Sequence, residues 1–80
     1  MNPPIVIHRK EALRLLEDRQ PHRLRLWKLS TGDILLYPQA TCIGGFKRGG
    51  THRVRLFPSG EIREFRDITL FEIDDMKIYI

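Results

Sequence analysis

Alternation of apolar with charged side chains is the feature that most limits how this chain can fold. It runs through residues 22–29, where Leu24 and Leu26 have charged or aromatic neighbours, and again through residues 51–57, around Val54 and Leu56. Successive side chains of a β-strand point to opposite faces, so each segment is predicted to be a strand with one buried face. The opposite faces of the two strands carry Arg23, Arg25, Trp27, Arg53 and Arg55.

Turn-forming residues separate these segments from further strands. Gly, Pro, Ser and Asp gather at residues 30–33, 58–60 and 74–75, which predicts three turns. Residues 34–43 are predicted to be another strand, in which Pro38 marks an edge or a bulge. Strands joined by hairpins at such short intervals predict a mainly β fold: a small five-stranded SH3-like barrel, with an OB-type barrel as the alternative topology.

The N-terminal part of the chain has a different pattern. Ala12, Leu13 and Leu16 recur at helical spacing and share one face, and Pro21 prevents a helix from continuing. Residues 5–7 are predicted to be a short edge strand or a cover for one end of the core, and the prolines at positions 3 and 4 to belong to a loose arm. We therefore expect an arm at 1–7 and a single domain at 8–80, with a short helix at 8–20 and a β-barrel at 22–80.

A chain of 80 residues has room for one hydrophobic core. The inward positions of the predicted elements give its expected members: Leu13, Leu16, Leu24, Leu26, Ile34, Leu36, Val54, Leu56, Ile62, Ile68, Leu70 and Ile78. Phe65 competes with Ile62 for the same face. Since so small a domain buries little area, a homodimer is expected.

Cys42 is the only cysteine, so no internal disulfide is expected, and the N-terminus lacks the apolar core of a secretory signal. The longest apolar run spans residues 34–37, far short of the about 20 residues that cross a bilayer. These features predict a cytoplasmic protein without a membrane segment.

Charge is distributed unevenly along a chain whose net charge is +4. Residues 8–28 hold seven Arg or Lys against three acids, and residues 42–66 hold six against two, whereas residues 67–80 hold four acids and one lysine. Such a polarised surface favours encounters with nucleic acid, or pairing of the basic and acidic surfaces of two copies.

The segments LSTGDIL at 29–35 and RVRLFPSGEIR at 53–63, with the basic glycine-rich loop between them, carry a resemblance. Together they resemble a group of short uncharacterised proteins from gut anaerobic bacteria and their prophages. The resemblance covers roughly residues 30–80. It implies a mobile-element context, and no functional residue is carried over from it.

Residues that serve catalysis are sparse. His8, His22, His52 and Cys42 lack the close-paired spacing of metal ligands, so they are expected to be structural, and no metal or cofactor is expected. Glu61 and Glu64 are three residues apart and face opposite sides of a strand, so they do not form an acid/base pair. No phosphate-binding or nucleophile motif occurs, and we expect a protein that is not an enzyme.

The first functional hypothesis is a basic binding module that contacts the backbone of DNA or RNA. Its candidate residues are the two arginine-bearing strand faces together with a glycine-rich loop, 44–50, that holds two cations: Arg23, Arg25, Trp27, Lys47, Arg48, Arg53 and Arg55. If the strands are neighbours, their faces merge into one basic surface with an aromatic side chain. The alternatives are a solvated outer face and a flexible hairpin tip.

The second hypothesis is a protein-interaction or assembly subunit. The C-terminal segment 76–80 is nearly uncharged and is predicted to be an edge strand that extends the sheet of a partner or of a second copy. Its candidate residues are Met76, Ile78, Tyr79 and Ile80.

Overall fold

A computed structural model describes residues 5–46 and 48–80. Among these residues the chain forms one α-helix, one short 3-10 helix and seven strands. In chain order the elements are β1 (Val6–His8), α1 (Arg9–Leu16), β2 (Pro21–Trp27), β3 (Ile34–Phe46), β4 (Thr51–Leu56), β5 (Ile62–Arg66), η1 (Asp67–Thr69), β6 (Leu70–Ile73) and β7 (Met76–Tyr79). The prediction of a mainly β fold with a short N-terminal helix is confirmed.

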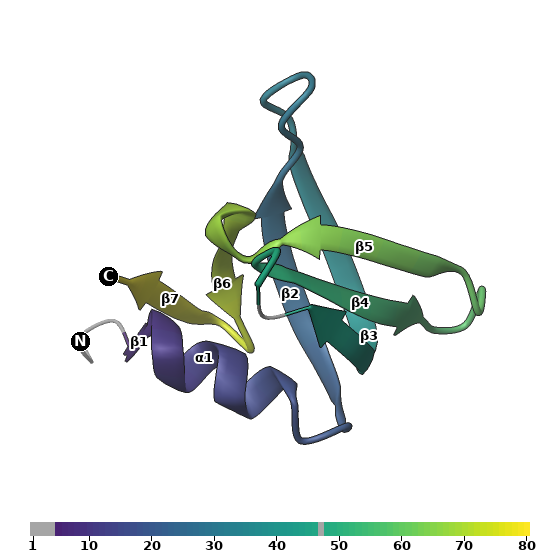
Figure 1. Ribbon diagram of the computed structural model, residues 1–80, viewed down its shortest axis with the longest axis horizontal. Helices are drawn as coiled ribbons and strands as arrows, with labels where there is room; N and C mark the ends of the chain where they lie inside the picture. Colours follow the sequence, from purple (N-terminus) through teal and green to yellow (C-terminus); the bar gives the residue numbers. More distant parts are fainter. Residues whose placement is uncertain (1–4, 47) are drawn as a thin grey trace.

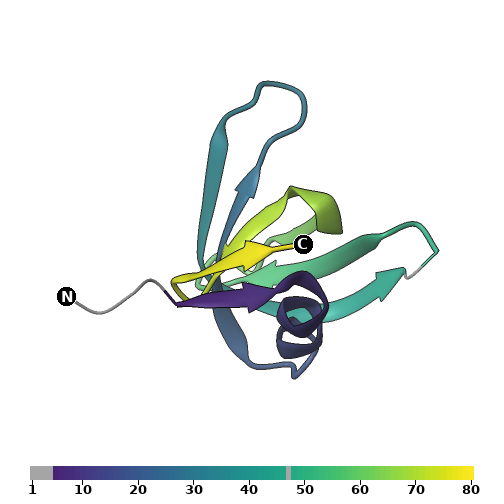
Figure 2. The same ribbon diagram turned by 90° about the vertical axis from the view of Figure 1, so that its left-hand side faces the viewer.

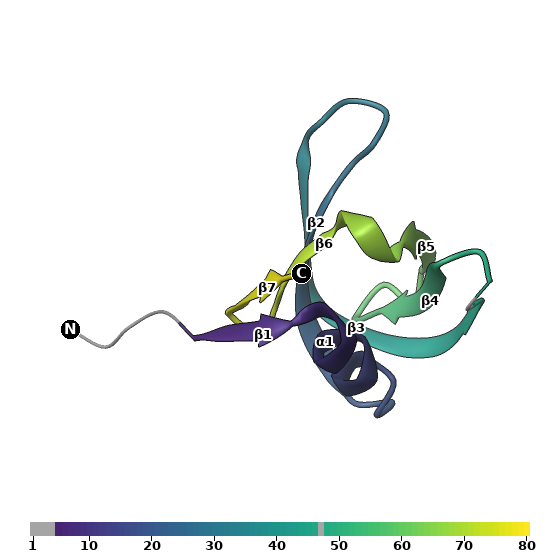
Figure 3. The same cartoon turned by 60° about the vertical axis from the view of Figure 1, so that its left-hand side comes forward.

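The seven strands form one sheet in the order β1-β7-β6-β2-β3-β4-β5. All neighbours are antiparallel except β1 and β7. The sheet does not close, because β1 and β5 lie at its two ends. Its β2–β3 hairpin projects above the rest, and the β4–β5 hairpin curls away from it (Figures 1 and 3). The expected count of five strands is wrong, because β7 and β1 continue the same sheet beyond β6.

A bulge in β3 decides which of its side chains face inward. His22 pairs with Ala40 but Leu24 with Tyr37, so β3 holds one extra residue around the predicted irregularity at Pro38. A one-residue shift exchanges the two faces of a strand. Ile34 and Leu36 consequently face outward, with 48% and 47% of their surface exposed, and their predicted place in the core is wrong.

The core lies on the inner side of the curved sheet, under α1. Five predicted members are buried: Leu16, Leu24, Leu26, Val54 and Leu70. Leu13, Leu56 and Ile78 are partly buried and pack against the core. Ala12, Ala40, Cys42, Phe65 and Ile73 complete it.

Two further core predictions fail in the C-terminal half. Ile62 is half exposed because Phe65, three residues later on the opposite face of β5, is the side chain that turns inward. Ile68 is exposed because it lies in η1 instead of a strand, so the alternation does not apply to it.

The helix is shorter than expected. It begins at Arg9, where the side chain of His8 accepts a hydrogen bond from the N–H of Lys10 (3.1 Å), and it ends at Leu16, with Glu17 as its C-cap. Acidic side chains are unfavourable at the negative end of a helix dipole, and Arg19 has a positive φ of 64°. The chain therefore leaves the helix before the predicted end.

The C-terminal strand is not an edge. On one side β1 pairs with it in parallel through Ile7 and Ile78, and on the other β6 pairs with it through Glu72 and Lys77. Figure 2 shows β1 and β7 running side by side. The prediction that residues 76–80 form a free edge is wrong, because β1 (Val6–His8) covers this side of β7. An edge strand was one of the two alternatives predicted for residues 5–7, and it is found one residue later. The prolines of the predicted arm, at positions 3 and 4, lie outside the described residues.

The glycine-rich segment is only partly a loop. Gly44 and Gly45 belong to β3 and pair with Arg53 and His52, after a second bulge beyond Cys42. The predicted loop at 44–50 is therefore shorter. Among the described residues, no helix has both the length and the apolar character that a membrane crossing requires.

Candidate functional site

The predicted basic surface is divided in the structure. Arg23, Arg25 and Trp27 lie on β2 and Arg53 and Arg55 on β4. These strands are not neighbours, because β3 lies between them. Uncharged side chains of β3 therefore separate the two rows of arginines, and Leu36 pairs with Arg25 while Thr41 pairs with Arg55.

Most of these arginines have carboxylate partners. Nη1 of Arg23 lies 3.0 Å from Asp75, Nη1 of Arg25 lies 3.4 Å from Glu72, and Nη2 of Arg53 lies 3.4 Å from Glu64. Each pair leaves less positive potential for a phosphate backbone. Binding there requires the guanidinium to be shared with its carboxylate or to leave it.

Trp27 is not an isolated stacking platform. The centroids of the Trp27 and Phe71 rings are 4.9 Å apart. The guanidinium of Arg25 lies over the Phe71 ring, 5.6 Å from its centroid. Nearly half of the Trp27 surface is still exposed. Together with Ile34, its cross-strand partner, it forms an apolar area on the outer face.

Arg48 and Arg55 are exposed, and no carboxylate of the described residues lies within ion-pair distance of either. Lys47, the remaining predicted contact, lies outside the described residues. Two separate exposed arginines of the predicted set thus have no ion-pair partner within residues 5–46 and 48–80.

The acidic C-terminal segment is neutralised within the same chain. Asp67 contacts His52, Glu72 contacts Arg25, and the aspartates of the last turn contact His22 and Arg23. These contacts involve all four of its acidic side chains, which leaves less negative charge for pairing with a second copy, one of the two alternatives predicted for the polarised surface.

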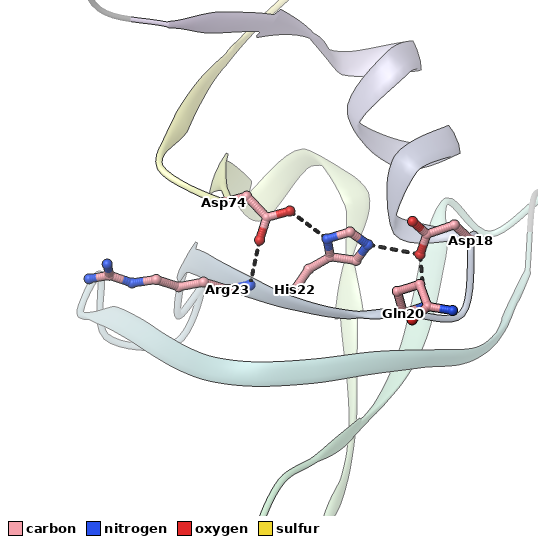
Figure 4. Close-up of polar contacts among 5 residues, drawn as sticks. All are labelled: Asp18, Gln20, His22, Arg23 and Asp74. Carbon is pink, nitrogen blue, oxygen red and sulfur yellow. Dashed lines mark hydrogen bonds and ion pairs between the residues drawn. The ribbon is translucent and has the colours of Figure 1, made fainter.

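His22 joins three parts of the chain. Its buried ring lies on the inner face of β2, where Nε2 is 2.8 Å from Asp18, just after α1, and Nδ1 is 2.5 Å from Asp74, in the β6–β7 turn (Figure 4). Asp74 also accepts a hydrogen bond from the N–H of Arg23 (2.9 Å). The N–H of Gln20 donates to Asp18 (2.8 Å), so both carboxylates are held in place from elsewhere.

His52 makes an equivalent bridge on β4. Its Nε2 lies 2.9 Å from Glu17 and its Nδ1 lies 2.5 Å from Asp67. The ring is buried and stacks on Phe65. Gly45 covers its other side, since an added Cβ there would lie 3.2 Å from Cδ2 of His52. The adjacent residues Glu17 and Asp18 therefore contact two different buried histidines.

Burial and the carboxylates act on these histidines in opposite directions. Burial lowers the pKa of each ring, but the hydrogen bonds and negative charges of Asp18 and Asp74 outweigh it and raise the pKa of His22. Glu17 and Asp67 raise the pKa of His52 in the same way. The backbone N–H of Gln20 and then the contact with His22 lower the pKa of Asp18.

A cavity of about 530 Å³ opens between the base of the β2–β3 hairpin and β5. Its lining includes the apolar and aromatic residues Leu35, Tyr37 and Phe65 and the basic residues Lys28 and Arg66. Burial raises the pKa of the Tyr37 hydroxyl. Apolar and polar residues both line the cleft, and a concave surface of this kind is a candidate ligand site.

Each side of this cleft has a strand edge without a pairing strand: the outer edge of β5, and the edge of β2 beyond the end of β6. The N–H of Leu56 donates to the carbonyl of Glu61 (2.8 Å), and the N–H of Asp67 donates to the carbonyl of Gly50 (2.7 Å). Bonded and non-bonded pairs alternate in an antiparallel ladder, so Glu64 and Arg66 direct their backbone groups away from β4. On the other side, β6 pairs with β2 only as far as Leu26.

Sequence reasoning missed the cleft and both histidine bridges. The bridges join residues up to 52 positions apart, which no local pattern contains. One signal was present: His22 and His52 occupy the inward phase of their alternating strands, where a polar ring needs buried partners. Among the described residues, no group of three or more potential ligands is arranged to hold a metal ion.

No family model, curated protein or solved structure matches this chain. The candidate site therefore rests on the geometry alone.

Proposed function

We propose that this protein is a non-enzymatic binding module that takes up an extended, acidic segment of another polypeptide in the cleft beside β5. The observation that carries the proposal is the position of the cleft, between an open strand edge and the base of a projecting hairpin. An extended chain laid there can add a strand to the sheet and place alternate side chains over Leu35 and Phe65.

The open edge supplies the affinity expected of such a contact. Glu64 presents both its N–H and its carbonyl to the cleft side, in the direction that an added strand would need. Arg66 presents its N–H, while its carbonyl already accepts a hydrogen bond from the hydroxyl of Thr69 (2.6 Å). Neither phosphates nor bases pair with a strand in this way, so the edge favours a polypeptide over a nucleic acid.

Charge favours an acidic occupant. Lys28 and Arg66 line the cleft and have no carboxylate of the described chain within ion-pair distance, whereas Glu64 is already paired with Arg53. Glu72 and the other C-terminal acids are held in their own contacts, which argues against the tail of a second copy as the occupant. A partner that added a strand to β7 would have to displace β1.

The strand order also supports an SH3-like reading of the central unit. The strands β2 to β5 form a continuous meander, η1 follows, and β6 returns beside β2. We infer that this unit is an open SH3-like sheet to which β1, α1 and β7 were added. A cytoplasmic location is part of the proposal, and burial of the single cysteine, Cys42, is consistent with it.

Titration with a pool of blocked hexapeptides tests the proposed site. The pool alternates Glu with Val, Ile, Leu or Tyr, and a matched pool carries Lys in place of Glu. We expect the acidic pool to shift the amide signals of Glu64, Arg66 and Leu35 in NMR spectra, and the basic pool to leave them unchanged. Absence of shifts at these amides with the acidic pool would rule the cleft out.

Position 64 offers a matched pair of variants. Glu64→Pro removes the outward N–H, which an edge strand tolerates, whereas Glu64→Ala keeps it, and both variants lose the ion pair with Arg53. Peptide binding should therefore disappear in the first variant and persist in the second. Equal binding by both would contradict strand addition. If the proline variant does not fold, Leu29→Asp supplies the test. Leu29 is exposed on the opposite side of the cleft, and the added negative charge should weaken binding of the acidic peptides.

Binding of a nucleic-acid backbone is the second candidate function. The observation that favours it is the net charge of +4 together with the exposed side chains of Arg48 and Arg55, which have no carboxylate within ion-pair distance in the described part of the chain. Its weakness is the separation of the two rows of arginines by β3. The salt dependence of polynucleotide binding distinguishes it from the first candidate, as argued in the Discussion.

A further inference from the structure

We propose that His22 and His52 form a pH-operated latch that fastens the C-terminal end of α1 to the sheet while both rings are protonated. The latch consists of these two rings and the four carboxylates that they contact, which are Asp18 and Asp74 for the first ring and Glu17 and Asp67 for the second. It does not depend on whether the cleft binds a peptide.

The number of donors carries the argument. An ionised carboxylate only accepts hydrogen bonds, and a neutral imidazole has one N–H and one acceptor nitrogen. Both nitrogens of His22 lie at 2.5 and 2.8 Å from carboxylate oxygens, and both nitrogens of His52 at 2.5 and 2.9 Å. All four contacts are satisfied at once only when both rings are imidazolium ions.

The position of the carboxylates explains why loss of a proton acts on the helix. Glu17 and Asp18 follow the last turn of α1, where negative charge opposes the helix dipole unless a cation is near. A neutral ring leaves one of its two carboxylates without the imidazole N–H, at a part-buried contact. Asp18 and Asp74 each keep a bond to a backbone N–H, of Gln20 and of Arg23 respectively. At His52, Glu17 is 44% exposed and Asp67 16%, so the carboxylate on the helix side is the one that water can take over. The helix is therefore released through Glu17.

The other groups around the rings do not replace the missing proton. Asp74 and Asp75 occupy the same turn, but the guanidinium of Arg23 is directed to Asp75. His52 faces Phe65 on one side, at 6.2 Å between centroids, and Gly45 on the other. Among the described residues, the charged groups that contact the two rings are the four carboxylates.

The sign of the pH dependence follows from the raised pKa of both rings. Their contribution to stability is complete below the pKa of an unfolded histidine, about 6.5, and is lost as the pH rises through the higher folded values. In this interval each histidine changes the ratio of folded to unfolded protein by up to about tenfold per pH unit. At the acid end the latch fails differently, as the pH falls through the lowered pKa of Asp18.

The test compares the parent protein with the double variant Glu17→Gln, Asp18→Asn between pH 6 and pH 9. We expect the parent to lose thermal stability as the pH rises, with hydrogen exchange of the α1 amides increasing before that of the β4 amides. The double variant should show a much flatter profile, and a control variant, Glu11→Gln on the exposed side of α1, should follow the parent.

Histidine titration in the parent protein provides a second measurement that does not need a variant to fold. Ring signals of His22 and His52 should titrate above the range of an unfolded histidine, whereas a latch-free pair would titrate at or below it. The proposal is overturned if both rings titrate at or below that range, or if parent and double variant lose the same stability between pH 6 and pH 9.

Discussion

Gly45 lies so close to the buried ring of His52 that a Cβ at position 45 would be in tighter contact with the ring than ordinary van der Waals packing allows. A Cβ added to Gly45 would come within 3.2 Å of Cδ2 of His52 and of the carbonyl oxygen of Thr51. The glycine at this point of β3 serves close packing and not a positive φ. This relationship connects the glycine-rich segment to the histidine bridge.

Replacement of Gly45 by Ala should therefore destabilise the protein. The neighbouring ring must move by a few tenths of an ångström, and overpacking of this kind costs about 1–3 kcal/mol. The adjacent Gly44→Ala variant is the control, because an added Cβ there meets nothing within 4 Å. Urea denaturation of both variants checks the difference, and equal midpoints would show that His52 yields without strain.

The pairing of β2 with β3 predicts losses of stability of different size for Leu26 in β2 and Leu36 in β3. Leu26→Ala removes a side chain that is 1% exposed, and we expect a loss of about 2–5 kcal/mol. Leu36→Ala alters an outward side chain and should cost about 0.5 kcal/mol or less. Thermal melts of the two variants decide whether Leu36 faces outward. A large loss for Leu36→Ala would return it to the core and contradict the register.

Binding of polynucleotides should be weak and should depend on few arginines. Each phosphate contact with duplex DNA contributes about 0.9 to the slope of log affinity against log salt. Arg55→Ala should remove about one such contact. Arg53→Ala should remove less, because Glu64 already neutralises this side chain. Fluorescence anisotropy with a duplex at several salt concentrations measures the slopes. Absence of binding even at ~50 mM salt would exclude the nucleic-acid candidate, because counterion release makes such binding strongest at low salt.

Removal of residues 78–80 should affect the fold before it affects association. Ile7 pairs with Ile78 and His8 with Tyr79, so the deletion leaves β1 without most of its partner strand. We expect a lower melting temperature and faster hydrogen exchange in β1 and α1. Sedimentation of the parent and the truncated chain tests the predicted homodimer at the same time. If the parent protein is a dimer and the truncated chain is a folded monomer of equal stability, the result would favour association through β7.

Local patterns in the sequence were sufficient to predict the mainly β fold, the helix and the hairpin turns. The alternation around Leu24, Leu26 and Val54 placed these side chains correctly, because alternation is a property of each strand by itself. Pro38 marked the bulge for the same reason, since it cannot take part in a regular ladder. Such signals need no knowledge of the neighbouring strand.

Tertiary structure decided the rest, because it depends on which strands become neighbours. The phase of Ile34 and Leu36 follows from the pairing of β3 with β2, and the pairing of β1 with β7 covers the edge that was expected at the C-terminus. The bridges of His22 and His52 join the end of α1 to turns far along the chain. Contacts between distant segments leave no local period in the sequence, so only the folded chain brings these carboxylates, these rings and the open edge of β5 into place.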